Sequence, residues 1–183
     1  SPPRQVLRHE NAAAPAMRIS FEKEHSMKLP HIHIIATGGT IAAHETSAMQ
    51  TTGYRGDNLL LANELIRSIE GIEAHAEITA ENIFSLPSSA MDEAHLLQLA
   101  RRVNELLADP AVDGLVITHG TDTLEETAFF LYLTAKSPKP VVITGSMLPA
   151  SAHSADGPGN LINAICTAAS RESWGKGVMV CMC

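Results

Sequence analysis

The stretch His31-Ile32-His33-Ile34-Ile35-Ala36-Thr37-Gly38-Gly39-Thr40 decides the fold of this 183-residue chain. It joins an apolar run to a turn that is rich in glycine and threonine. A second stretch has the same form, because Leu115-Val116-Ile117 leads into Thr118-His119-Gly120-Thr121-Asp122-Thr123. Ligands of open α/β sheets bind at the carboxyl ends of the strands. We therefore expect both turns to line one pocket, with threonines as candidate nucleophiles.

Apolar patterns along the rest of the chain predict strands that alternate with helices. Strands are expected at about 31–36, 74–79, 114–118, 141–144 and 177–182, and helices at about 58–70, 92–108, 124–135 and 159–170. Thr123 and Glu126 predict a capping box at the start of the third helix. The alternation predicts an α/β fold with a mainly parallel sheet and helices on both faces.

The two ends of the chain differ from this regular middle. Residues 1–30 contain four prolines and no clear periodicity, so they are interpreted as a flexible N-terminal extension, and 31–183 as the α/β domain. The extension lacks the continuous apolar core of a secretory signal. The apolar run 178–183 reads as a buried strand in which the sequence stops, so the domain is expected to be truncated at its C-terminal end.

Composition narrows the classes of partner. A net charge of −7 argues against a nucleic-acid surface, and no apolar stretch approaches the roughly 20 residues of a membrane span. Cys166, Cys181 and Cys183 form no disulfide framework and are expected to be reduced, packed thiols. His31 and His33 have no partner at a metal-ligand spacing, so no metal is expected.

Thr40 is the first candidate for chemistry. Gly38 and Gly39 have no Cβ, so backbone amides can approach a ligand closely beside it. A threonine hydroxyl becomes a nucleophile only when a base removes its proton. The alternative is a tight turn in which the Thr40 hydroxyl is simply hydrogen-bonded.

Other polar residues are expected at the same end of the sheet. Thr121 and Asp122 follow the third strand, where Asp122 either holds a substrate amino group or caps the helix together with Thr123. Ser88 and Ser89 follow the second strand, and Ser89 alternatively caps the next helix. Tyr54, in the long loop 37–57, either exchanges a proton with a threonine or anchors the loop. The segment 154–160 is expected to shape its loop and to cap the fourth helix, with pocket lining as the alternative.

Residues 34–42 and 117–128 resemble the two signatures of bacterial-type L-asparaginases and glutaminase-asparaginases. The segments 145–147 and 154–161 also fit this family. The resemblance covers about residue 30 to the end. It implies the flavodoxin-like, Rossmann-like N-terminal domain of the family, without its smaller C-terminal domain.

The resemblance implies hydrolysis of L-asparagine to L-aspartate and ammonia without a metal or organic cofactor, and leaves L-glutamine open as a second substrate. By position, Thr40 resembles the nucleophile and Tyr54 its hydrogen-bonded partner. Thr121 and Asp122 resemble the second catalytic threonine and its aspartate, which also contact substrate. Ser88 resembles the residue that binds the substrate's α-carboxylate, with Ser89 beside it. Ser89 resembles the residue that cytoplasmic members of the family have at this position, which implies a cytoplasmic location. A periplasmic location stays open if an upstream signal has been removed.

The family's catalytic lysine lies beyond the last strand found here, so the chain alone is expected to have little activity. The family forms homodimers and homotetramers. Two alternatives remain open: the amidase component of a tRNA-dependent amidotransferase, and a non-catalytic fragment. The expected partner is a small-molecule substrate, with neither nucleic acid nor membrane.

Overall fold

The computed structural model describes residues 28–43, 62–67 and 69–182. Its centre is one sheet of five strands in the order β2-β1-β3-β4-β5, and every neighbouring pair is parallel. The strands are β1 His31–Gly38, β2 Glu77–Leu86, β3 Gly114–Thr118, β4 Val141–Thr144 and β5 Val178–Val180. This is the flavodoxin-like strand order, and it confirms the predicted parallel α/β class.

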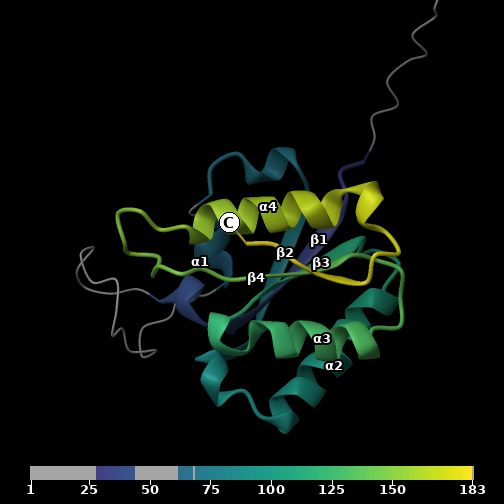
Figure 1. Ribbon diagram of the computed structural model, residues 1–183. Helices are drawn as coiled ribbons and strands as arrows, with labels where there is room; N and C mark the ends of the chain where they lie inside the picture. Colours follow the sequence, from purple (N-terminus) through teal and green to yellow (C-terminus); the bar gives the residue numbers. More distant parts are fainter. Residues whose placement is uncertain (1–27, 44–61, 68, 183) are drawn as a thin grey trace, which may run out of the picture.

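Helices cover both faces of the sheet (Figure 1). Those on one face are α1 Ala62–Arg67 and α4 Gly157–Ala169, and those on the other are α2 Glu93–Ala108 and α3 Leu124–Thr134. Every residue of β3 and β4 is buried, because each of these strands has a helical layer on both sides. The bounds of these two strands agree with the predicted ones, because each strand is a continuous apolar run followed by turn residues.

Successive side chains of each strand enter two separate cores. Ile32 and Ile34 of β1 pack with α4 residues such as Ile165. Ile35 of the same strand packs with α2 residues such as Leu99 and Val103. This alternation follows from the period of two in a strand. It fixes the register of β1, and with it the position of the turn that begins at Gly38.

The start of α2 differs from one of the expectations. Asp92 is the N-cap, and its carboxylate accepts a hydrogen bond from the His95 backbone N–H at 3.0 Å. Ser89 therefore does not cap this helix. The predicted capping box of α3 is also wrong, because Thr123 makes no side-chain cap bond and its hydroxyl instead donates to the Ser88 carbonyl at 3.0 Å.

Strand β2 begins and ends later than the predicted 74–79. Residues Ile72–Ala74 form a 3-10 turn, and the strand begins after it at Glu77. It continues to Leu86 through a segment in which polar and apolar residues are mixed. It is an edge strand, so residues on its exposed positions need not be apolar. Its pairing with β1 shifts register between Ala36 and Gly38, which brings Leu86 opposite Gly38.

The last strand is shorter and less buried than predicted. β5 lies at the other edge of the sheet, where Val180 is 51% exposed. Within the predicted first helix 58–70, the structure describes α1 at Ala62–Arg67 and non-helical backbone at 69–70, so the predicted end of this helix is too late. Residues 1–27, Tyr54 and Cys183 lie outside the described residues. Cys166 and Cys181 are free thiols and partly buried. In the described part of the chain, no helix is long and apolar enough to cross a membrane.

Candidate active site

The turns after β1 and β3 pack directly against each other. An ideal Cβ on Gly39 would lie 2.4 Å from the Gly120 backbone nitrogen, so only glycine permits this approach. The Thr37 hydroxyl donates to the Thr118 carbonyl at 2.8 Å and ties the ends of the two strands together. From β1 the chain moves outward to β2, whereas from β3 it moves the other way to β4 and β5, so the strand order reverses between β1 and β3 and makes this the topological switch point of the sheet. The two threonine-rich turns thus meet at the position where open α/β sheets bind ligands.

Thr40 begins the 3-10 turn Thr40–Ala42 at the end of β1. Gly38 and Gly39 before it have φ angles of 104° and 80°, a region that favours glycine. The Gly39 N–H donates to the Leu86 carbonyl at 3.2 Å, so the end of β2 also holds this turn. Thr40 itself is 8% exposed. The ends of the two strands beside β1, which are β2 and β3, therefore hold the backbone that carries the Thr40 side chain.

Ser88 links the end of β2 to the turn after β3. Its hydroxyl accepts a hydrogen bond from the Asp122 backbone N–H at 3.1 Å, and its carbonyl accepts one from the Thr123 hydroxyl. Gly120 lies directly against it, because an ideal Cβ there would be 2.5 Å from the Ser88 Oγ. Ser88 is buried, whereas Ser89 beside it is exposed. The structure therefore brings Ser88 to the Thr121–Asp122 turn.

Thr121 and Asp122 belong to the 3-10 turn Thr121–Thr123 that leads into α3. Thr121 is half-buried and Asp122 is exposed. Amides at the start of a helix favour anions, but the Asp122 N–H is already bonded to Ser88. An ideal Cβ on Gly145, at the end of β4, would contact the Thr121 methyl carbon at 3.5 Å. The turn after β3 thus lies between those after β2 and β4.

His119 is a structural member of this region to which the sequence assigned no role. It is fully buried, its Nδ1 lies 2.8 Å from the Gly120 carbonyl oxygen, and its Nε2 lies 3.1 Å from the Thr127 hydroxyl. A carbonyl only accepts, so Nδ1 carries the proton and Nε2 of the neutral ring accepts from Thr127. Burial lowers the pKa of His119 below its usual 6.5. Its place inside the threonine-rich turn was the signal that could have identified it.

The loop after β4 is held against the other turns by Asp156 and Asn160. The Asp156 carboxylate accepts from the backbone N–H groups of Met147 and Leu148, both at 2.9 Å. Asp156 is the N-cap of α4 but makes no side-chain cap bond, so the predicted loop-shaping role is confirmed and side-chain capping is not. Asn160 donates to the Gly145 carbonyl at 3.0 Å.

The histidines of β1 lie on the α2 side of the sheet and bond to β2. The Thr79 hydroxyl is 2.8 Å from His31 Nε2 and 2.7 Å from His33 Nδ1. Burial lowers the pKa of His33, although Glu81, 3.5 Å from its Nε2, acts in the opposite direction. No cluster of three or more histidine, cysteine or acidic side chains that could hold a metal occurs among the described residues.

Hydroxyls, a carboxylate and backbone amides therefore lie together at the carboxyl ends of the strands. Thr40, Ser88, Thr121 and Asp122 are on the described turns, with Ser89 beside them, and Tyr54 lies outside the described residues. Such a set of groups suits attack on a carbonyl carbon by a hydroxyl, with amides to stabilise the resulting oxyanion.

Comparison with known proteins agrees with this arrangement. Residues 31–183 match the family model of the asparaginase N-terminal domain. The chain is 51% identical over 152 residues to L-asparaginase 2 of Bacillus subtilis, covering 83% of this chain and 40% of that protein. It is 45% identical over 161 residues to a glutaminase-asparaginase of Pseudomonas fluorescens, covering 88% and 44%.

A solved structure, described as a probable cytoplasmic L-asparaginase from Campylobacter jejuni, superimposes with a TM-score of 0.78 at 46% identity. The match covers 83% of this chain and 45% of that one. The chain thus spans less than half the length of these relatives. By sequence and by fold, it belongs to the asparaginase family and carries the family's N-terminal domain.

Proposed function

We propose that this chain carries part of the active site of an amidohydrolase that converts L-asparagine to L-aspartate and ammonia. The observation that carries the proposal is the backbone contact between Gly39 and Gly120. It places the turn of Thr40 beside the turn of Thr121 and Asp122 at the switch point of the sheet. The names of the Bacillus and Pseudomonas relatives support asparagine as a substrate, with glutamine as a second one.

In the proposed reaction, Thr40 Oγ attacks the side-chain amide carbon of asparagine. The hydroxyl proton passes to the leaving nitrogen, the C–N bond breaks, and ammonia leaves behind an ester between Thr40 and the aspartyl group. Water then attacks the ester, releases L-aspartate and returns the proton to Thr40. Backbone amides near Gly39 and Thr121 stabilise the oxyanion, where one such donor contributes about 3 kcal/mol.

The neighbouring side chains take complementary roles in this proposal. Thr121 and Asp122 relay protons during acyl transfer, and Asp122 also holds the substrate's ammonium group. Ser88 binds the α-carboxylate: its hydroxyl already accepts from Asp122 N–H, which leaves its proton for donation. Exposed Ser89 lies at the rim of the site. Tyr54 serves as hydrogen-bonded partner of Thr40.

We further propose that the chain has little activity alone, because it spans only 40% to 45% of the relatives' length. The sharpest test is therefore a chimera, in which residues 31–182 replace the matching segment of the Bacillus L-asparaginase 2. Ammonia release from L-asparagine and from L-glutamine is measured for the chimera and for the chain alone. We expect an active chimera and a chain whose rate is close to background.

A matched pair of variants assigns the effect. Thr121→Ala in the chimera should remove most of the activity, whereas Thr134→Ala, at the end of α3, should leave it unchanged because its hydroxyl donates to the Phe130 carbonyl within that helix. A folded chimera without amidase activity would contradict the proposed function. Full activity in the Thr121→Ala chimera would contradict the role of that residue alone.

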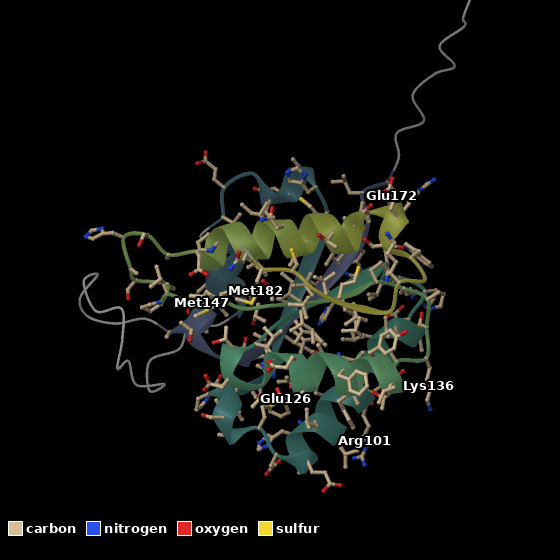
Figure 2. The ribbon with its side chains drawn as sticks, viewed as in Figure 1. Arg101, Glu126, Lys136, Met147, Glu172 and Met182 are labelled. Atoms are coloured by element: carbon tan, nitrogen blue, oxygen red, sulfur yellow. The ribbon has the colours of Figure 1, made fainter. Side chains whose placement is uncertain are left out.

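We also propose that the protein self-associates through α3. Phe129, Tyr132 and Leu133 lie on one face of this helix and are between 55% and 66% exposed. Glu126 lies in the first turn of this helix, and Lys136 lies just after its last residue (Figure 2). Two copies packed antiparallel would therefore pair opposite charges across an apolar centre.

Sedimentation equilibrium tests this association. Leu133→Glu should shift the chain toward monomer, while Met147→Glu, an equally exposed apolar side chain in the loop after β4, should not. A monomeric wild type, or equal effects of both substitutions, would contradict the α3 contact. The proposed location is the cytoplasm, supported by the description of the Campylobacter structure.

A further inference from the structure

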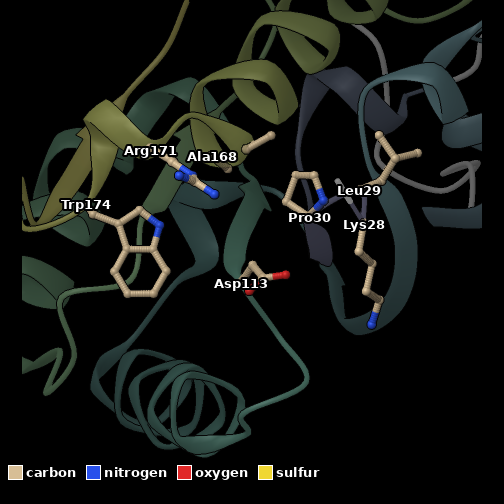
Figure 3. A pocket seen from close by; sticks show the side chains of 8 residues that line it. Lys28, Leu29, Pro30, Asp113, Ala168, Arg171 and Trp174 are labelled. Carbon is tan, nitrogen blue, oxygen red and sulfur yellow. The ribbon is translucent and has the colours of Figure 1, made fainter. Parts of the chain in front are cut away.

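A cleft of about 730 Å³ lies beside the amino ends of β1 and β3 (Figure 3). The candidate active site is at the carboxyl ends of the same strands. Pro30 precedes β1 and Asp113 precedes β3, so both are at the amino ends of their strands. The remaining lining comes from the segment before Pro30, the carboxyl end of α4 and the 3-10 turn that follows it: Lys28, Leu29, Ala168, Ala169, Arg171 and Trp174. The volume is that of an ordinary small-molecule site.

The two sides of the cleft have different chemistry. Trp174 and Arg171 lie on one side, and Pro30, Leu29 and Lys28 lie on the other, with Asp113 between them (Figure 3). Trp174 is 45% exposed, so much of its indole is open to a ligand. Buried Ala168 adds a small side chain, which leaves room between the two sides. The cleft therefore offers an aromatic surface and an apolar surface that face a common space.

Charge in the cleft favours an anion. Arg171 and Lys28 have no ion pair within the described ranges 28–43, 62–67 and 69–182. The single carboxylate, Asp113, already accepts from the His31 backbone N–H at 2.8 Å, and its own N–H donates to the His31 carbonyl. The carboxyl end of α4 adds partial negative charge, which Arg171 directly after it offsets. The two cationic side chains of the lining, Lys28 and Arg171, thus outnumber its one carboxylate.

We propose that this cleft binds a small organic anion that carries a flat ring. The ring packs on the Trp174 indole and against Pro30, and the anionic group, a carboxylate or a phosphate, pairs with the Arg171 guanidinium. Lys28 adds a second positive charge on the opposite side. The cleft is separate from the proposed amidase site, because the two lie at opposite ends of β1 and β3.

The chain contains one tryptophan, so fluorescence excited at a wavelength that tyrosine does not absorb reports on this cleft. The full chain is titrated at constant ionic strength with phenyl phosphate and with benzoate, which separate phosphate from carboxylate recognition. Two further compounds serve as controls: inorganic phosphate has no ring, and the ring of cyclohexanecarboxylate is not flat. We expect saturable quenching by at least one ring-bearing anion below about 10 mM, and binding at least about fivefold weaker for both of the other compounds.

Variants locate the binding. Arg171→Ala should weaken the ring-bearing anion about tenfold, and Arg171→Lys should weaken it less because the charge remains. Arg101→Ala removes a cation from α2, away from the cleft, and should have no effect. Urea unfolding of each variant checks that it folds. No saturable quenching by either ring-bearing anion would overturn the proposal, as would equal affinities of the Arg171→Ala and Arg101→Ala proteins. Neither result depends on amidase activity.

Discussion

Gly120→Ala tests the packing of the turn after β3 against Ser88, at the end of β2. Gly120 has φ −78° and ψ 153°, an extended conformation that alanine adopts without strain. The cost of the substitution is therefore steric. An ideal Cβ at this position would lie 2.5 Å from Ser88 Oγ, 2.8 Å from Ser88 Cβ and 3.1 Å from Ser88 N.

Two of these three contacts are with the Ser88 side chain, which is buried and cannot simply turn away. Its hydroxyl also holds the Asp122 N–H, so moving it strains or breaks that hydrogen bond. Overpacking of this kind costs about 1–3 kcal/mol, and loss of the bond adds about 1 kcal/mol. We therefore expect Gly120→Ala to lower the free energy of unfolding by about 2–4 kcal/mol.

A double-mutant cycle isolates the clash. Ser88→Gly removes both the Oγ and the Cβ, so of these three contacts only the one with the Ser88 backbone nitrogen remains. The single variants and the double variant are compared by urea unfolding followed by circular dichroism. We expect the double variant to be more stable than the sum of the single effects predicts, by at least about 1 kcal/mol. Additive effects, or a Gly120→Ala protein as stable as the wild type, would refute the packing of these turns.

Two further predictions concern buried polar groups. Because the folded state lowers the His119 pKa, the unfolded state binds more protons below about pH 6.5, and stability falls as the pH drops through this range. His119→Gln removes this contribution, so urea unfolding at pH 7.5 and pH 5 should show a smaller acid loss for the variant, and an equal loss would argue against a buried neutral ring. The Thr144 hydroxyl is buried without a hydrogen-bond partner in the described part of the chain, so Thr144→Val should raise the free energy of unfolding by about 1 kcal/mol. Thr127→Val, which deletes the partner of His119, should instead destabilise, and stabilisation by both would contradict this reasoning.

Much of the fold was predictable because buried parallel strands leave a clear record in sequence. β3 and β4 are apolar at nearly every position and are followed by turn residues, so their bounds followed directly. β2 was misplaced because an edge strand tolerates polar residues such as Glu81 and Asn82. The capping errors have a related cause, since the Thr123 hydroxyl is bonded to a carbonyl 35 residues away rather than to its own helix.

The site was predictable to the extent that topology alone brings residues together. Turns after parallel strands share one edge, so the meeting of the Gly39 and Gly120 turns followed from the strand pattern. The bond from Asp122 N–H to Ser88 did not, because it depends on how three loops pack in three dimensions. His119 is a different case, because its bonds to Gly120 and Thr127 are local and its place inside the threonine-rich turn was visible in the sequence. The catalytic roles themselves remain predictions.

The attack by Thr40 is the central claim, and the most direct measurement is kcat for L-asparagine in the chimera with and without its hydroxyl. We predict that Thr40→Ala lowers kcat by at least about 10³-fold while the protein stays folded, because no other group replaces the nucleophile. The Thr134→Ala chimera provides the matched control. A Thr40→Ala chimera that releases ammonia at a rate near that of its parent would contradict the account.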